Sequence, residues 1–288
     1  AERLSFASRI LRGTGLFLCG DLYHTLAPVI LKDDDGEVAF APLPYAEPGK
    51  VREALSADVH THEEAERVLS DFLLRQMGHA ARKVAIAHEF VAGGSASDSE
   101  RPLSIGGTDL ISADIFAPYN YTALGHLHGP QQAGGKENVR YSGSLLKYSF
   151  SEATQKKGVI VGEIDGAGQV KTEFISLSPR HDVRVIKGFF DDLIKGESED
   201  FLMAELLDEG PVIDAMARLR QKYPRMMTIQ SHRRMNSGSG ERSFDLMKKV
   251  DPLDMFRVFY KEFQDKEFTE EEEDYMKELW DDLRKEDD

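Results

Sequence analysis

The sequence has little of several features that mark other classes of protein. Cys19 is its only cysteine, which excludes an internal disulfide and suits a reducing compartment. No stretch approaches the roughly 18 consecutive apolar residues of a membrane span, and no signal peptide opens the chain. We therefore expect a cytoplasmic protein that has no membrane partner.

Positive charge is also scarce, because 36 lysines and arginines stand against 51 aspartates and glutamates and leave a net charge of −15. The excess is greatest at residues 265–288, where thirteen acids face four bases. Proteins that bind nucleic acid usually carry a basic surface. Any phosphate contact must therefore be local, and must come from metal ions, a few nearby groups or a partner subunit.

Two histidines follow an apolar run at residues 121–130, YTALGHLHGP. On extended backbone, residues i and i+2 point the same way, so His126 and His128 can face one pocket. Gly125 suits a strand end that a ligand or another backbone approaches closely. The pattern favours a metal site, although an H-x-H pair also occurs by chance.

A second stretch, KVAIAHEF at residues 83–90, has the same organisation, because a short apolar run ends in His88. Ligands of open α/β sheets sit outside the carboxyl ends of the strands. Three imidazoles meeting there would suit Mn, Fe, Co or Zn better than a Ca or Mg cage. The two stretches together predict a metal centre at one sheet edge.

These motifs resemble the SbcD family of nuclease subunits, which belongs to the calcineurin-like metallophosphoesterases. The similarity is carried by GHLHGPQ at 125–131, YSGSLLKYSFSE at 141–152, AHEF at 87–90, the pair Gly106 and Gly107, and LPYAEP at 43–48. It extends over most of the chain. The resemblance implies that His88 and His126 bind one metal ion and His128 a second. Two ions, expected to be Mn²⁺, would clamp a phosphodiester and activate a water.

The resemblance also implies that part of the site is missing. In the family, the patterns D-x-H, GD and GNHD supply aspartates, an asparagine and further histidines from an N-terminal third. The opening AERLSFASRIL resembles the helix that follows GNHD. We therefore expect a truncated sequence whose catalytic residues are unknown and lie in the missing segment. By itself this chain is expected not to hydrolyse DNA.

One pair in the printed sequence imitates the GD pattern. Gly20 and Asp21 follow the apolar run 16–19, which we expect to be a strand. The strands predicted at 28–31 and 37–43, with a turn at 33–36 between them, place this pair downstream of the metal-binding third. We therefore leave Asp21 out of the site.

The loop that follows the histidines offers donors to a substrate. Tyr141, Ser142 and Ser144 carry hydroxyls, and Gly143 permits close approach of the backbone to an anion. The resemblance implies that this loop lies beside the metals and helps to bind nucleotide or DNA backbone. Alternatively, the segment only closes the sheet.

A capping-box pattern at Thr61 and Glu64 predicts a helix that ends at Met77. His60, His62 and His79 flank or open this helix, and we interpret them as surface residues. A glycine- and serine-rich stretch at 93–102 predicts a mobile loop beside His88. It either shapes substrate entry or is a plain solvent loop.

With 288 residues the chain can form more than one domain. We expect an α/β (α+β) protein: a metallophosphoesterase β-sandwich flanked by helices at 1–179, N-terminally truncated, with a hairpin at 158–177. A small α/β capping domain follows at 180–231, with the order strand, helix, strand, helix, strand. In the family the capping domain partly covers the active site and selects among DNA substrates.

A linker at 232–243, flexible at 236–240, leads to a helical tail at 244–288. The tail is predicted to contain two helices, the second opened by a capping box at Thr269 and Glu272. So many aromatic residues beyond a linker suggest docking elsewhere, and packing on the chain's own body is the alternative. The resemblance implies that the tail binds an SbcC-type ATPase by helix-in-groove contact.

The sequence thus predicts a subunit of an ATP-linked double-strand exonuclease and single-strand endonuclease. It would process DNA ends and hairpins in recombination, replication and repair, as a homodimer within a heterotetramer that also contains the ATPase. Two other classes remain open. One is a metallophosphoesterase for small phosphate esters, and the other is a non-catalytic scaffold that holds an ATPase partner.

Overall fold

The computed structural model describes residues 8–100, 110–208 and 210–231, together with Tyr260, Thr269, Glu272, Glu273, Tyr275 and Met276. The first of its elements is a short helix, α1 (Ser8–Arg12). Within these ranges, no helix is both long and apolar enough to cross a bilayer.

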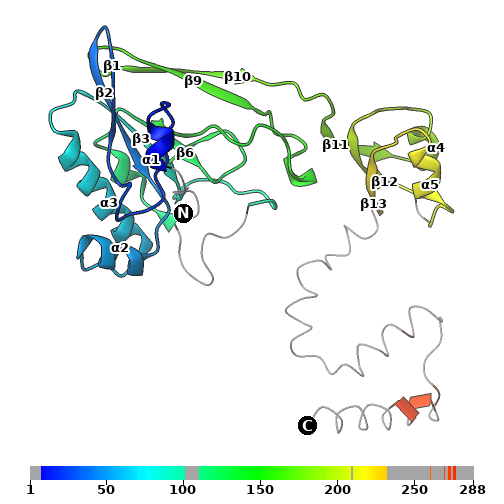
Figure 1. Ribbon diagram of the computed structural model, residues 1–288. Helices are drawn as coiled ribbons and strands as arrows, with labels where there is room; N and C mark the ends of the chain where they lie inside the picture. Colours follow the sequence, from blue (N-terminus) through cyan, green and yellow to red (C-terminus); the bar gives the residue numbers. More distant parts are fainter. Residues whose placement is uncertain are drawn as a thin grey trace.

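A mixed six-stranded sheet forms the centre of the larger part of the molecule (Figure 1). In spatial order it consists of β1 (Val29–Asp33), β2 (Gly36–Leu43), β3 (Arg82–His88), β6 (Tyr121–Gly125), β8 (Lys136–Tyr141) and β7 (Gln131–Ala133). The four inner strands are parallel, and β1 and β7 pair antiparallel at the edges. The strands predicted around residues 28–31 and 37–43, and those leading to the histidines, are confirmed.

Two helices, α2 (Pro48–Leu55) and α3 (His62–Met77), contribute buried side chains to the same hydrophobic core as the strands of this sheet. α3 begins at the predicted capping box, because the Glu64 N–H donates to Thr61 Oγ1 and the Glu64 carboxylate accepts from the Thr61 N–H. Leu69 and Leu73 of α3 are fully buried in the same cluster as Ala85 and Ala87 of β3. The predicted helix and its last residue are confirmed.

The opposite face of the central strand β3 is much less covered. Ile86 is 49% exposed, although parallel strands are normally buried on both faces. Val84 is only partly buried, and His88 ends the same row of side chains. This face therefore leads directly to one of the predicted metal ligands.

Two further small sheets lie beside the central one. The hairpin of β9 (Gly158–Ile164) and β10 (Val170–Ser176) is confirmed, and Arg140 of β8 donates to Thr172 at 2.9 Å. β4 (Phe90–Val91) pairs with β5 (Leu110–Ile111). Because these pairs form sheets of their own in the described residues, the β-sandwich remains a prediction.

Residues 183–231 build a separate three-stranded parallel sheet (Figure 1). Its elements run β11 (Val183–Gly188), α4 (Phe190–Leu193), β12 (Phe201–Leu206), α5 (Ala215–Arg220) and β13 (Met226–Ser231). This is the predicted order of strands and helices. Phe190, Leu202 and Leu219 belong to a buried cluster distinct from that of the large sheet.

The run 16–19 is not a strand, so that prediction was wrong. Within the described ranges it pairs with no strand, and it leads into a turn in which the Thr25 hydroxyl accepts from the backbone N–H groups of Gly20 and Asp21. The Asp21 carboxylate accepts from the Tyr23 N–H at 2.9 Å and contacts His24 Nδ1 at 2.7 Å. Asp21 thus serves the turn itself.

Several predictions fall on other parts of the chain. Gly106 and Gly107, the linker at 232–243 and most of the helical tail lie outside the described residues. The second capping box is confirmed, because the Glu272 N–H donates to Thr269 Oγ1 at 3.3 Å and the Thr269 N–H donates to Glu272 Oε2 at 2.9 Å.

The prediction that three histidines lie at the surface was correct for His60 and His79 and wrong for His62. His62 is buried, and its Nε2 forms a hydrogen bond with the carboxylate of Glu89. The first turn of α3 packs against the sheet end, and this tertiary contact has no local sequence signal. Tyr45 contributes to it, with its ring centroid 4.7 Å from that of His62.

Glu66, one turn along α3 from His62, is also fully buried, and neither carboxyl oxygen has a hydrogen-bond partner within the described ranges. Burial raises the pKa of Glu66 well above its ordinary value of 4.5, and the neighbouring Glu89 raises it further. Folding therefore favours the protonated acid. Because this pKa is raised in the folded state, the associated stability is present below the unfolded pKa and is lost as pH rises.

Glu66→Gln removes the ionisable group but keeps its shape. We expect the free energy of unfolding of this variant, relative to the wild type, to increase between about pH 5 and about pH 8. Urea denaturation at several pH values measures the difference. Asp71→Asn, at an exposed position of the same helix, is the control. A difference for Glu66→Gln that does not change with pH would contradict the buried-acid interpretation.

Candidate metal centre

His88 and His126 meet at the carboxyl end of two neighbouring parallel strands. In the β3–β6 pairing, His88 lies opposite Gly125, so the residue after the glycine begins just beyond the sheet. The two imidazole centroids are 5.5 Å apart, with the rings nearly perpendicular. Two of the three predicted ligands are therefore brought together as the sheet-edge argument expected.

Gly125 makes this approach possible. A Cβ atom at this position would lie 2.8 Å from His88 Nδ1, a distance that real Cβ atoms essentially never show. The next residue, His126, has a φ of +107°, a region that non-glycine residues rarely adopt. Such strained backbone persists only where the surrounding structure holds it, and it is concentrated at functional sites.

The electrostatic setting of His88 suits a metal ligand. Burial lowers the pKa of His88 below its ordinary value of 6.5, so the ring is neutral at neutral pH. A neutral imidazole is the form that donates a lone pair to a cation.

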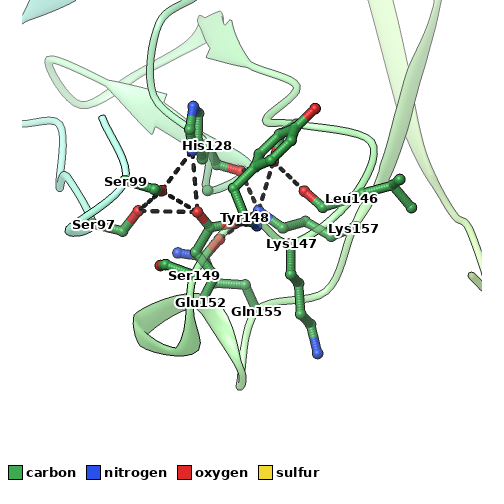
Figure 2. A network of polar contacts seen from close by, with 12 residues as sticks. Ser97, Ser99, His128, Leu146, Lys147, Tyr148, Ser149, Glu152, Gln155 and Lys157 are labelled. Carbon is green, nitrogen blue, oxygen red and sulfur yellow. Dashed lines mark hydrogen bonds and ion pairs between the residues drawn. The ribbon is translucent and has the colours of Figure 1, made fainter. Parts of the chain in front are cut away.

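His128 lies in a different set of contacts, in a polar network (Figure 2). Its Nδ1 is 2.7 Å from Ser99 Oγ and 3.1 Å from Glu152 Oε1. Its ring centroid is 5.3 Å from that of Tyr148, which is 67% exposed. The backbone of His128 is also held, because its N–H donates to Glu100 Oε1 at 2.7 Å.

Glu152 is the centre of this network, and its side chain is fully buried. Lys157 Nζ is 2.6 Å from Glu152 Oε2, and the Ser99 hydroxyl donates to Oε1. Burial by itself raises the pKa of Glu152, but the bonds from Lys157, Ser99 and His128 outweigh it and lower the pKa to about 2. The carboxylate is therefore ionised at neutral pH.

The loop predicted to bind substrate is largely engaged by the protein itself. Tyr141 is fully buried, and its hydroxyl donates to Glu89 O at 2.7 Å and accepts from the Val91 N–H at 2.9 Å. These bonds favour the alternative that Tyr141 closes the sheet, and its contact with a substrate stays a prediction. Ser142 and Ser144 are partly buried.

The close approach predicted at Gly143 is present, but its partner is protein backbone. Gly143 has a φ of +78°, and a Cβ there would lie 2.6 Å from His128 O. The Ser144 N–H and Lys157 Nζ donate to the same oxygen, at 3.0 and 2.8 Å. The loop therefore holds the histidine segment in place.

Sequence reasoning missed Ser99, Glu152 and Lys157. Glu152 ended the motif that carried the resemblance, and Ser99 lies in the glycine- and serine-rich stretch. No local pattern connects them, because 53 residues separate Ser99 from Glu152. Within that stretch, Ser97 and Ser99 both bond to Glu152, and the mobility of the loop stays a prediction.

The chemistry of the three predicted ligands fits a transition-metal centre, since imidazole is a common ligand of Mn, Fe, Co and Zn. Three histidines alone do not make a complete metal centre. Within the described ranges, no three histidine, cysteine, aspartate or glutamate side chains are grouped so as to hold an ion. His88 and His126 form a pair, and the contacts of His128 lie with Ser99, Glu152 and Tyr148.

Comparison with known families adds an independent observation. Residues 179–263 match the family model SbcD_C, described as type 5 capsule protein repressor C-terminal domain. The carboxy-terminal region is of the SbcD type. The match includes the three-stranded sheet of β11, β12 and β13 and continues beyond it, whereas His88, His126 and His128 lie outside the matched residues.

The start of this SbcD-type region is bonded directly to the segment at residues 147–153. Lys147, whose side chain is 9% exposed, donates to Ala153 O at 2.7 Å, to Asp182 Oδ2 at 3.0 Å and to Val183 O at 3.2 Å. Asp182 and Val183 open β11, and Ala153 follows Glu152. One lysine therefore connects the start of the SbcD-type sheet with the segment that carries Glu152.

Tyr141→Phe tests the structural role of the buried hydroxyl. The change leaves the Val91 N–H without its acceptor, and we expect a loss of about 1–3 kcal/mol in the free energy of unfolding. Chemical denaturation measures the loss, and Tyr148→Phe, at an exposed ring, should change stability little. Weaker DNA binding at unchanged stability would instead assign Tyr141 to the substrate.

Proposed function

We propose that this chain is the nuclease subunit of an SbcD-type complex and acts in metal-dependent hydrolysis of DNA phosphodiesters. The observation that carries the proposal is the His88–His126 pair at the carboxyl edge of a parallel sheet, in a chain whose carboxy-terminal region matches the SbcD model. Ligands of parallel α/β sheets are bound at this edge.

His88, His126 and His128 would hold divalent cations, for which we propose Mn²⁺. When bound, such ions supply an activated water and neutralise charge on the phosphate. The protein's own contribution is geometric. Gly125 admits the His88 ring, and the strained backbone turns His126 beyond the strand end. The loop at residues 141–144 holds the segment that carries His128.

The SbcD-type region supports the proposed partners. Lys147 ties the start of this region to the segment that also carries Glu152, which supports a position near His128. We propose that this region limits which DNA structures enter, and that the chain works as a homodimer with an SbcC-type ATPase bound to its tail. The acidic balance of the chain agrees with DNA contacts that are local or lent by the partner.

A second candidate is a non-catalytic scaffold that binds the ATPase. It is favoured by the absence of any three-ligand metal group among the described residues. The two candidates differ in one simple property, because a scaffold has no need to bind Mn²⁺.

His126→Ala in the full chain separates them. We expect Mn²⁺ affinity, measured by equilibrium dialysis with metal analysis, to fall about tenfold or more. Even the loss of a residue that only hydrogen-bonds to a metal ligand lowers metal affinity about 10- to 100-fold. His79→Ala, at an exposed position, should bind Mn²⁺ like the wild type. If wild type, variant and control bind Mn²⁺ equally weakly while an SbcC-type ATPase is still captured, the scaffold function is correct.

A further inference from the structure

The ring of His128 is held through one of its two nitrogens. Nδ1 lies within hydrogen-bond distance of both Ser99 Oγ and Glu152 Oε1, at 2.7 and 3.1 Å. A neutral imidazole carries its proton on either Nδ1 or Nε2, and the partners of one nitrogen decide which tautomer forms. The network around Nδ1 therefore determines the chemistry of Nε2.

Both partners of Nδ1 are arranged as acceptors. The Glu152 carboxylate is fully buried beside Lys157 Nζ and accepts the Tyr148 N–H, which stabilises its ionised form. An ionised carboxylate can only accept. The Ser99 hydroxyl gives its own proton to Glu152 Oε1, so it presents a lone pair to the ring. These two acceptors favour the neutral ring that carries its proton on His128 Nδ1.

Lys157 couples this arrangement to the backbone. Its Nζ contacts Glu152 Oε2 and also donates to His128 O at 2.8 Å and Ser144 Oγ at 2.9 Å. With Glu100 accepting the His128 N–H at 2.7 Å, both the ring and the peptide groups of His128 have fixed partners. The ring cannot rotate without breaking charged hydrogen bonds.

We propose that Glu152, held by Lys157 and assisted by Ser99, is a positioning residue that fixes His128 as the Nδ1–H tautomer and leaves the Nε2 lone pair for a divalent cation. The assignment of a cation rests on the proposed function, whereas the tautomer does not. Histidines that bind metals commonly donate their second ring N–H to a carboxylate or carbonyl. Neither the three-histidine pattern nor the SbcD_C match assigns this role to Glu152.

The first measurement uses the metal-free wild type. Long-range ¹⁵N–¹H correlation spectra of the histidine-labelled full chain, with His128 assigned from the missing signals of His128→Asn, report which ring nitrogen carries the proton. We expect a protonated Nδ1 and a pyridine-like Nε2. A proton on Nε2, or an equal mixture of tautomers, would overturn the proposal.

Glu152→Gln then tests the cause. The amide can donate to Nδ1, so we expect His128 to shift toward the Nε2–H tautomer and Mn²⁺ affinity to fall about 10- to 100-fold. Lys157 keeps acceptors at His128 O, Ser144 Oγ and Gln155 Oε1, which favours folding of the variant. Ser99→Ala, which removes one acceptor and retains the ion pair, should give a smaller change in the same direction.

Glu163→Gln is the matched control, because Glu163 is an exposed carboxylate on β9. It should leave tautomer and Mn²⁺ affinity unchanged. An unaltered His128 tautomer in Glu152→Gln overturns the positioning role. Failure of the proposed function gives a different result, in which the wild type shows the Nδ1–H tautomer but binds no Mn²⁺, and the positioning role then stands without the cation.

Discussion

The parallel pairing of β3 with β6 is the constraint on which the candidate site depends. Parallel strands end at the same edge of a sheet, and here the register sets His88 opposite Gly125. A shift of one residue would turn His88 to the face packed by α3. The buried row of Ala85 and Ala87 against α3 opposes that shift, so the packing of one face fixes the chemistry of the other.

A second constraint is the burial of charge beneath His128. Burying a carboxylate is costly unless it is paired and its lone pairs are filled. Glu152 meets this condition through Lys157, Ser99 and the Tyr148 N–H. Together with the contact to His128 Nδ1, these bonds join three segments that are distant in the chain, namely those of Ser99, His128 and residues 148–157. The cost of burial is therefore offset only when all three are in place. Such a network gives a loop-borne histidine the rigidity that strands give His88.

The polar cluster at the start of α3 differs from this network. Glu152 is ionised because its partners are cations and donors and lower its pKa, whereas burial and a neighbouring carboxylate both disfavour the charge of Glu66 and raise its pKa. Lys147 then extends the order around Glu152 to the first residues of β11. The SbcD-type region is thereby linked to the histidine segment through a single cation.

The sequence by itself determined the regular elements and their chemical character. Short apolar runs placed the strands before His88 and His126, capping boxes placed two helix starts, and turn residues placed the hairpin around residues 165–168. These signals are local, because propensity, caps and turns depend on neighbours within a few residues. The sequence also identified the three candidate ligands, since residue type decides what can donate to a metal.

Only the tertiary structure decided which of these residues meet. It paired His88 with His126 and directed His128 to Ser99 and Glu152. It buried His62, which sequence alone assigned to the surface, and Tyr141, for which the sequence left both substrate binding and closure of the sheet open. Among the described residues, it left residues 16–19 without a strand partner. The physical reason is the same in each case: burial and hydrogen-bond partners come from residues tens of positions away, and no local pattern records them.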